Sequence, residues 1–465
     1  MCWKNGQNNL ILCWKNGQIM IKRKITSRLV NFYNNSHKAL LLTGARQTGK
    51  SFSIRHFAQS NFKHYIEINF VEQPNARNIF VNATNVQDML MRLSAFTPDE
   101  LVQGETMIFL DEIQECPEAL TAVKFLVEEG SYRYIMSGSL LGVEMKDLRS
   151  VPVGYIDVWE MFPLDMEEFF EAVGVSERIM THIRTSWEQL QPIDEVIHEK
   201  LMAIFRLYLI VGGMPAVVQK YLDTNNLQHV IEEQQAILRL YEIDIAKYDP
   251  DNKLYIREIF RLIPPELNAK NKRFILKNLN EHIKFSRYEN SFVWLKDAGV
   301  ALPTFCVDEP KAPLLLSRSR NLFKLFQNDV GLLAASYANG IQMRILNDDP
   351  NINFGAIYEN LVAQELSSHG FNLYYFNSKK QGEVDFLIEK SGNALPIEVK
   401  SGKTYQRHNA LSNVMADPSY GIREALVLSG ANVSVTGYVK YMPIYLLMFL
   451  KKEEVQPLLY KVDLP

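Results

Sequence analysis

The chain has 465 residues, of which 47% are hydrophobic and 22% are charged, and its formal net charge is −3. A chain of this length is expected to form roughly two to four domains, and the composition is typical of soluble globular proteins. The near-neutral charge excludes a general attraction to nucleic acid, so any such binding needs a local basic patch. The four cysteines include no Cys-x-x-Cys pair, which argues against a disulfide scaffold or structural zinc site and favours a reducing, cytoplasmic location.

The first residues carry a short duplication, because "CWKNGQ" occurs at 2–7 and again at 13–18. Two copies are too few for a solenoid, and we interpret residues 1–19 as a tail outside the fold, with Met20 as an alternative start. The sequence "WKNGQ" interrupts the apolar residues, so no signal peptide is expected. The best apolar run, at 441–450, is about half of the roughly 20 residues that a membrane span needs, which predicts no membrane association.

Short apolar runs alternate with helical stretches from residue 39 onward. Strands are predicted at 39–43, 64–68, 106–110 and 132–136, with helices at 50–60 and 118–130. This alternation predicts an α/β core with a mostly parallel sheet, assigned to residues 20–195. Residues 196–347 have a mainly helical period. Strands return in a C-terminal α/β domain over 348–465, at 373–376, 384–389, 395–399 and 424–430.

A phosphate-binding loop follows the first of these strands. It matches G-x-x-x-x-G-K-[ST] and comprises Gly44, Ala45, Arg46, Gln47, Thr48, Gly49, Lys50 and Ser51. The glycines let the backbone wrap around a phosphate, while loop N–H groups and the following helix N-terminus attract the anion. Lys50 is expected to reach the β and γ phosphates of ATP, and Ser51 to hold Mg²⁺. A glycine-rich turn without this function is the alternative.

Polar residues end two further predicted strands. In "MIFLDEIQE", Asp111 is expected to bind Mg²⁺, and Glu112 to orient and deprotonate the attacking water. Two solvated acids at a strand end are the alternative. The strand in "RYIMSGS" ends near Ser137 and Ser139, and Ser139 is our candidate for contact with the γ-phosphate. Arg149 is a candidate arginine finger, although an ordinary surface arginine remains an alternative.

Together, "GARQTGKS", "IFLDEIQ", "MSGS" and "PLDMEEFF" resemble a bacterial and archaeal branch of the AAA-type ATPases. The resemblance covers nearly the whole chain from Met20. It implies an ATPase core, a helical lid with a winged-helix region, and a C-terminal restriction-endonuclease-like domain of undefined role. In "LIVGGMPAVVQKYL", it also implies that Pro215, in a Gly-x-Pro motif, approaches the bound nucleotide; a plain helix start is the alternative.

The helical region contains a basic segment at 268–287. Its positive residues are Lys270, Lys272, Arg273, Lys277, Lys284 and Arg287. They are opposed only by Glu281, so the segment is a candidate DNA-binding surface. A solvated helix face and a protein-contact surface are the alternatives.

The sequence "GEVDFLIEKSGNALPIEVKSGK" predicts an antiparallel hairpin with its turn at 390–393. Alternate strand residues share a face, so Asp385 and Glu398 are expected to meet near the open end, with Lys400 beside them. Two adjacent carboxylates repel unless a cation lies between them. The alternative is an ordinary hairpin with one charged face.

A helix at 355–370 precedes this hairpin and carries Glu359. Helix Glu, strand Asp and Glu-x-Lys, in this order, resemble the PD-(D/E)XK nucleases, as do "YEN", "GEVDF" and "PIEVKSG". The resemblance implies that Glu359, Asp385 and Glu398 bind Mg²⁺ or Mn²⁺ and that Lys400 serves the attacking water.

These observations predict a Mg²⁺-dependent, cytoplasmic ATPase whose ATP state controls a C-terminal nuclease-like domain acting on nucleic acid. The alternative is an ATP-driven switch or adaptor whose C-terminal domain binds DNA or another partner without cleaving it. A P-loop kinase is a third interpretation, but Glu112 beside Asp111 suits water activation better. The sequence leaves the oligomeric state open.

Overall fold

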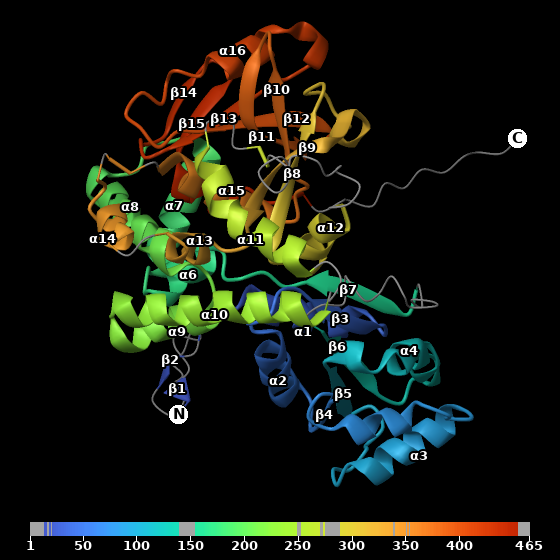
Figure 1. Ribbon diagram of the computed structural model, residues 1–465. Coiled ribbons are helices and arrows are strands. Elements are labelled where there is room, and N and C mark those ends of the chain that lie inside the picture. Colours follow the sequence, from blue (N-terminus) through green and yellow to red (C-terminus); the bar gives the residue numbers. More distant parts are fainter. Residues whose placement is uncertain are drawn as a thin grey trace, which may run out of the picture. The chain divides into compact units, whose positions relative to one another are not determined.

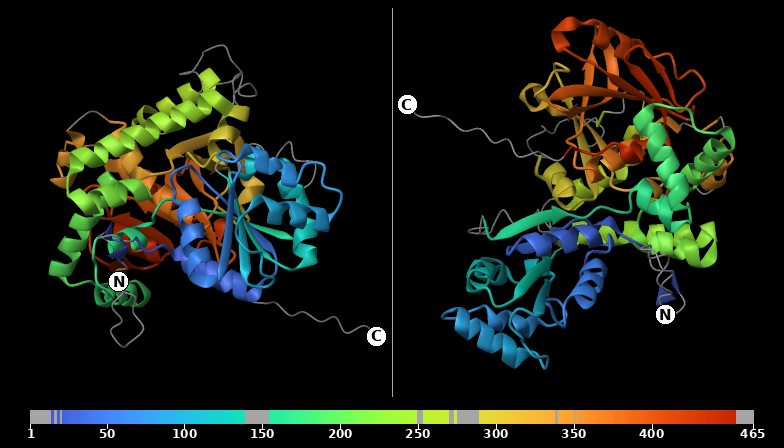
Figure 2. Two further views of the ribbon diagram at one scale, coloured as in Figure 1. Left: turned by 90° about the horizontal axis from the view of Figure 1, so that it is seen from below. Right: turned by 180° about the vertical axis from the view of Figure 1, so that it is seen from behind.

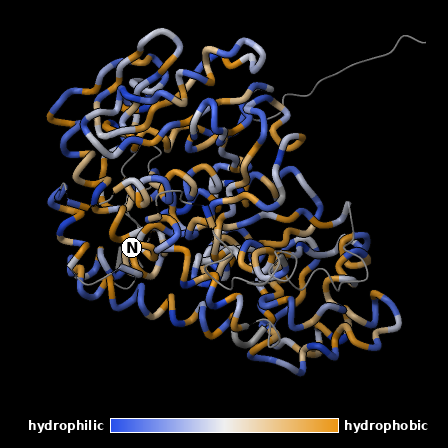
Figure 3. The backbone as a smooth tube through the Cα atoms, turned by 45° about the horizontal axis from the view of Figure 1, so that its top comes forward, coloured by the Kyte–Doolittle hydropathy of each residue, from blue (hydrophilic) through white to orange (hydrophobic). Residues whose placement is uncertain are grey.

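The computed structural model describes residues 14–15, 18–19, 21–138, 154–248, 253–269, 273–274, 289–337, 340–349, 351–352 and 354–453. Hydrophobic and hydrophilic stretches alternate along this part of the chain (Figure 3). The chain divides into two compact units. Unit 1 comprises Met1–Ser176, Ile204–Leu302 and Leu325–Ile352, and unit 2 comprises Glu177–Ala203, Pro303–Lys324 and Asn353–Pro465. The domain boundaries expected from the sequence stay predictions.

Unit 1 is built around a five-stranded parallel sheet in the order β4-β5-β6-β3-β7 (Figure 1). Its strands are β3 (Ala39–Thr43), β4 (His64–Asn69), β5 (Thr106–Asp111), β6 (Arg133–Ser137) and β7 (Ile156–Glu160). All residues of β5 are buried, as expected for a central parallel strand that is covered on both faces. The first strand of this sheet along the chain, β3, lies between β6 and β7, so the strand order changes direction beside it. Ligands of open α/β sheets bind at such a switch point.

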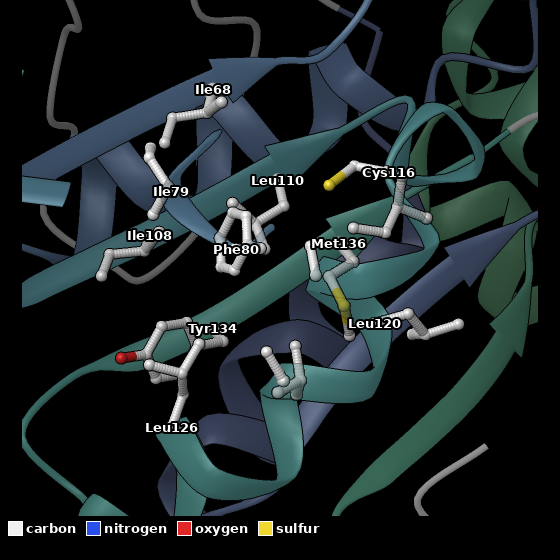
Figure 4. Packing of buried hydrophobic residues seen from close by; sticks show 14 of the residues in the cluster. Ile68, Ile79, Phe80, Ile108, Leu110, Cys116, Leu120, Leu126, Tyr134 and Met136 are labelled. Carbon is white, nitrogen blue, oxygen red and sulfur yellow. The ribbon is translucent and has the colours of Figure 1, made fainter. Parts of the chain in front are cut away.

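Helices cover both faces of this sheet (Figures 1 and 2). On one face, α1 (Lys24–Asn35) and α2 (Lys50–Asn61) pack on alternate residues of the central strands. On the other face, α3 (Val86–Phe96) and α4 (Pro117–Glu129) enclose the cluster drawn in Figure 4, which includes Ile108, Leu110 and Met136. Proline at the first position of α4 and a left-handed Gly130 after its end set the bounds of that helix. The predicted α/β core is confirmed.

The rest of unit 1 is mainly helical. Its described helices are α6 (Met166–Ala172), α8 (Glu195–Val211) from Ile204 onward, α9 (Pro215–Thr224), α10 (Leu227–Tyr248), α11 (Lys253–Asn268), α12 (Glu289–Asp297), α13 (Val330–Ala335) and α14 (Ile341–Leu346). Buried Asp329 caps α13 through the N–H of Leu332 at 2.9 Å and also accepts the N–H of Gly213 at 2.6 Å. Burial raises the pKa of Asp329 to about 6, against the opposing effect of these N–H groups. One carboxylate therefore ties the turn before α9 to the start of α13.

Glycines allow unusually close backbone approaches around these helices. A Cβ on Gly213 would lie 2.0 Å from the carbonyl oxygen of Leu164, and one on Gly331 would lie 2.5 Å from that of Val211. The segment before α6, the end of α8 and the start of α13 are consequently in direct backbone contact. Two-residue strands β1 (Trp14–Lys15) and β2 (Gln18–Ile19) form an antiparallel pair within the predicted tail.

Unit 2 contains most of an eight-stranded mixed sheet in the order β14-β15-β13-β12-β11-β10-β8-β9. The strands are β8 (Ala301–Val307), β9 (Arg318–Gln327), β10 (Tyr374–Ser378), β11 (Gly382–Lys390), β12 (Asn393–Val399), β13 (Ala425–Ser429), β14 (Ser434–Thr436) and β15 (Val439–Pro443). Its helices include α7 (Glu177–Gln189), the start of α8, α15 (Phe354–Ser368) and α16 (Asn409–Ala416). Strands β8 and β9 lie at one edge of this sheet, with β8 parallel to β10. The winged-helix assignment stays a prediction.

The predicted hairpin is β11 and β12, which pair antiparallel from Phe386 opposite Ile397 to Lys390 opposite Asn393. The two residues of the turn, Ser391 and Gly392, have φ values of 48° and 75°, as the common two-residue hairpin turns require. Asp385 and Glu398 are the next residues of the two strands beyond the pair of Phe386 and Ile397, at the open end of the hairpin. Among the helices that the structure describes, none has the length and apolar character needed to cross a membrane.

Candidate functional site

The P-loop connects the end of β3 to the start of α2 with a backbone that turns repeatedly into the left-handed region. Gly44, Gln47 and Gly49 have φ values of 124°, 67° and 91°. A Cβ on Gly44 would lie 2.3 Å from the carbonyl oxygen of Met161, so only glycine fits there. The following helix begins at Lys50, directly after the left-handed Gly49. A glycine-containing loop that leads directly into a helix N-terminus is typical of an anion-binding site.

Lys50 lies within the curve of this loop. Its Nζ donates to the carbonyls of Gly44 at 2.9 Å and Ala45 at 2.8 Å, and the side chain is buried. Burial lowers the pKa of Lys50 to about 8, although the nearby charges of Glu112 and Asp111 oppose that change. The ammonium is therefore held beside the position that the loop would give a phosphate, and the negative charge of a nucleotide would favour its protonated form.

The carboxylate of Asp111 accepts hydrogen bonds from residues at the ends of neighbouring strands and from the start of α2. Ser51 Oγ lies 3.1 Å from each of its carboxylate oxygens, and Asn69 Nδ2 donates to Oδ2 at 3.2 Å. The hydroxyl of Ser137 and the N–H of Glu112 also donate to Oδ1. Burial raises the pKa of Asp111, while the Ser137 and Ser51 hydroxyls act in the opposite direction. The structure thus brings together the predicted residues Ser51 and Asp111.

Glu112 follows Asp111 in the left-handed conformation, with φ 54°. A glutamate rarely adopts this conformation without a compensating contact. Its Oε2 accepts a hydrogen bond from Gln114 Nε2 at 2.5 Å, and the side chain is half-buried. The backbone therefore turns the carboxylate away from the strand direction at the same sheet edge as Asp111.

The structure also shows which strand-end residues the predictions chose and missed. Ser137 contacts Asp111, whereas the candidate Ser139 and the candidate arginine finger Arg149 lie outside the described residues. Asn69 was missed, although a polar residue after the apolar strand at 64–68 is the same kind of signal that identified Asp111.

Two segments of unit 1 approach the second half of the P-loop. Arg23 Nη1 donates to the carbonyl of Thr48 at 3.0 Å, and its Nε bonds to Glu168 at 3.1 Å. Pro215, at the start of α9, lies with its Cγ 3.5 Å from where a Cβ on Gly49 would be. The predicted closeness of Pro215 to the nucleotide loop is therefore present in the geometry, while its contact with a nucleotide stays a prediction.

Helix α10 and the turn after α12 approach the first half of the P-loop. Arg46 Nη1 forms an ion pair with buried Asp244 at 2.8 Å, and Tyr241 Oη donates to the Arg46 carbonyl at 3.2 Å. A Cβ on Gly299, whose φ is 71°, would lie 2.9 Å from the backbone nitrogen of Ala45. The conformation of the loop thus depends on residues far away in the sequence, which no local pattern had indicated.

Gly299→Ala should weaken ATP binding, because the new methyl group meets the backbone of Ala45 and must push the P-loop aside. The left-handed φ adds strain of about 1–2 kcal/mol for a non-glycine residue. Titration with a fluorescent ATP analogue measures the effect.

Gly104→Ala is the matched control, because Gly104 has a similar φ of 76° but no atom within 4 Å of the added Cβ. Gly104→Ala should keep wild-type affinity. Equal affinities of the two variants would show that the contact between Gly299 and Ala45 does not shape the loop.

The predicted residues of the C-terminal domain also lie together, within unit 2. Asp385 Oδ2 accepts the N–H of Val399 at 2.8 Å, and Glu398 Oε1 accepts from Lys400 Nζ at 2.6 Å. Burial would lower the pKa of Lys400, but the nearby charges of Glu398, Asp385 and Glu359 raise it. The structure therefore brings the helix glutamate, the strand aspartate and the Glu-x-Lys pair into one cluster.

Lys324, on β9, is a member of this cluster that the predictions missed. Its Nζ lies 2.8 Å from Glu383 Oε1 and 3.5 Å from Glu359 Oε2, and its side chain has no exposed surface. Burial would lower the pKa of Lys324, but Glu359, Asp385 and Glu383 together raise it well above its usual value. Within the described ranges, no three or more His, Cys, Asp or Glu side chains are arranged to hold a metal ion.

The predicted basic surface at 268–287 falls almost entirely outside the described residues. Lys270, Lys272, Lys277, Lys284 and Arg287 are all outside them, and so is Glu281. Arg273 is described and half-buried. DNA binding by this segment stays a prediction.

A parallel sheet with a P-loop after the strand at its switch point defines a P-loop NTPase core. In agreement, residues 36–170 match the model of an AAA domain. Residues 202–342 and 354–447 match two domains of unknown function, DUF8612 and DUF4143. The chain therefore contains an AAA-type ATPase domain, a fold that implies nucleotide binding. A nuclease-like identity of the C-terminal domain stays a prediction.

Solved structures with detectable similarity include the Walker-type ATPase PABY2304 of Pyrococcus abyssi, with 14% identity, a TM-score of 0.40, and coverage of 68% of this chain and 96% of that chain. Others are the T158V variant of RuvB from Thermotoga maritima (14%, 0.28, 60% and 87%) and Aeropyrum pernix ORC1 in complex with DNA (13%, 0.25, 70% and 91%). No curated protein matches the sequence. The assignment of the fold rests on the AAA domain match and on the sheet itself.

Proposed function

We propose that the protein is a Mg²⁺-dependent ATPase that works as a nucleotide-driven switch. The observation that carries this proposal is the convergence of the P-loop, Asp111 and Glu112 at one sheet edge. Ser51 Oγ and the Asp111 carboxylate lie at hydrogen-bond distance, so a single cation can take both as ligands without a large rearrangement. One or two protein ligands are enough for Mg²⁺, because the ion usually keeps several waters and also binds the phosphates of the substrate.

Each residue has a separate part in the proposed reaction. The loop N–H groups and Lys50 hold the phosphates, and Mg²⁺ would neutralise charge that develops on the transferring phosphoryl group. Glu112 accepts a proton from the attacking water, a role that its turn away from the strand favours. Ser137, fixed by its hydrogen bond to Asp111, is the candidate for contact with that water or the γ-phosphate.

Glu112→Gln should retain ATP binding and lower the hydrolysis rate by roughly 100-fold or more, since an amide cannot accept the proton. Phosphate release measures the rate, and equilibrium titration measures the binding. Glu115→Gln is the matched control: it changes a glutamate in the next turn that pairs with Arg77 instead, and should hydrolyse ATP normally. Full activity of Glu112→Gln would remove Glu112 from the mechanism.

The P-loop contacts offer a route by which nucleotide could influence unit 2. Gly299, against Ala45, lies two residues before the start of β8, which continues into unit 2 after Leu302. Tyr241 Oη, bonded to the Arg46 carbonyl, also accepts from Asn328 Nδ2 at 3.4 Å. Asn328 immediately follows β9, whose first part belongs to unit 2. A shift of the P-loop would therefore act on β8 through the chain after Gly299, and on β9 through the hydrogen bonds of the Tyr241 hydroxyl.

Tyr241→Phe should leave ATP hydrolysis near the wild-type rate but weaken this transmission, because it removes only the shared hydroxyl. ATP is expected to change amide hydrogen exchange in β8 and β9 of the wild type, and less so in the variant. Tyr337→Phe is the control, since its hydroxyl bonds to Asn268 away from the P-loop. An identical ATP response in wild type and Tyr241→Phe would contradict the route.

We further propose that the C-terminal domain binds its partner, with nucleic acid as the first candidate, without cleaving it. The arrangement of Glu359, Asp385, Glu398 and Lys400 supports descent from a nuclease-type site. The buried ammonium of Lys324 favours the non-cleaving form, because it lies 3.5 Å from Glu359 and would repel a metal ion bound to the same carboxylate.

A cleavage assay distinguishes the two forms. Plasmid, linear and single-stranded DNA and RNA are incubated with Mg²⁺ or Mn²⁺, with and without ATP, using wild type, Lys50→Ala and Asp385→Ala. We expect no cleavage that depends on Asp385, while gel-shift assays on the same substrates detect binding. Cleavage that disappears in Asp385→Ala would instead establish a working nuclease, and the Lys50→Ala result would show whether ATP controls it.

A further inference from the structure

Lys324 is a lysine without solvent contact in the middle of an acidic cluster. Its side chain has 0% exposure, and its Nζ lies 2.8 Å from Glu383 and 3.5 Å from Glu359. The ring centroid of Tyr375 lies 5.0 Å from the same atom. Lysine is almost never fully buried unless its charge is paired, so the carboxylates and the ring are the environment that holds it.

The three predicted metal ligands each have an oxygen engaged by a nitrogen. Glu359 faces Lys324, Glu398 Oε1 accepts from Lys400, and Asp385 Oδ2 accepts the N–H of Val399. Glu398 Oε2 is different, because it is buried and has no hydrogen-bond partner. A divalent ion would need several of these oxygens at once, and it would have to lie close to a buried positive charge.

We infer that Lys324 is the resident cation of this site and takes the place of a divalent metal ion. The inference deepens the proposed non-cleaving function of the C-terminal domain and rests on it. The ammonium lies within 3.5 Å of both Glu359 and Glu383 and offsets their mutual repulsion, so the cluster keeps its arrangement without any metal. In this site, a ligand would be bound by the charged side chains of the protein and not by a metal ion.

Replacing Lys324 by glutamine would remove the positive charge and leave a polar side chain of similar length. Glu359, Glu383 and Asp385 would then repel one another inside the protein, which destabilises the fold. A divalent ion would relieve that repulsion, and the unpartnered Glu398 Oε2 would add a further ligand. The variant is therefore expected to gain the metal site that the wild type does not use.

The experiment uses the nucleotide-free full chain and Mn²⁺ as the probe, with binding followed by electron paramagnetic resonance and stability by thermal unfolding. Wild type should show no Mn²⁺ binding that depends on Asp385. Lys324→Gln should melt at a lower temperature and bind one Mn²⁺, which restores about 5 °C at saturation. The gain should disappear in the double variant Lys324→Gln/Asp385→Asn.

Lys400→Gln is the matched control, because it removes a positive charge from the same cluster but keeps the buried ammonium. It should gain no Mn²⁺ site. Equal gains in Lys400→Gln and Lys324→Gln would overturn the inference, since they would show an effect of net charge and not of the position of Lys324. No gain in a folded Lys324→Gln would overturn it as well.

The wild type alone decides the question if Lys324→Gln does not fold. Mn²⁺ binding to wild type that is lost in Asp385→Asn would show a metal site beside Lys324 and overturn the inference. Its absence, with unchanged stability of wild type in Mn²⁺, would support the inference. These outcomes are separate from the proposed ATPase, which phosphate release tests, and from the non-cleaving function, which the cleavage assay tests.

Discussion

The buried carboxylate of Asp111 is the group on which the nucleotide end of unit 1 depends. A carboxylate in such a position is strongly unfavourable unless donors surround it. Here the donors come from β4, β6, α2 and the next peptide N–H, through Asn69, Ser137, Ser51 and Glu112. The hydrogen bonds to this one side chain therefore align the ends of three neighbouring strands with the first turn of α2. This arrangement also positions the P-loop, because the loop leads directly into the first turn of α2.

Features that depend on local rules were predictable from the sequence. The P-loop is recognisable because its glycines adopt backbone angles that few other residues adopt. The hairpin turn at Ser391 and Gly392 is recognisable for the same reason. The contact of Ser137 with Asp111 was not predictable, because a strand end can be placed only to within a few residues. Gly299 and Tyr241 gave no signal at all. Their roles arise from contacts with Ala45 and Arg46, which are more than a hundred residues away in the chain.

The same limit explains why Lys324 was overlooked. In the sequence it is one lysine in "NLFKLFQ", on a segment that was assigned to the helical region. Only the sheet order reveals that β8 and β9 extend the strands of the C-terminal domain. The Glu-x-Lys pattern drew attention to Glu398 and Lys400, which form an ion pair in the structure. It could not indicate the buried cation beside Glu359 and Glu383, because that cation comes from a strand outside the motif.

The close backbone approaches in unit 1 have a consequence for how such chains can diversify. Gly213 leaves no room for a side chain next to Leu164, and neither does Gly331 next to Val211. At these two points the helical segments meet other parts of unit 1 through main-chain atoms, which cannot adapt to a new neighbour as side chains can. If the helical region were replaced by that of a related chain, the residues on both sides of each contact would have to be exchanged together. Recombination within unit 1 that separates Gly213 from Leu164, or Gly331 from Val211, should therefore be poorly tolerated.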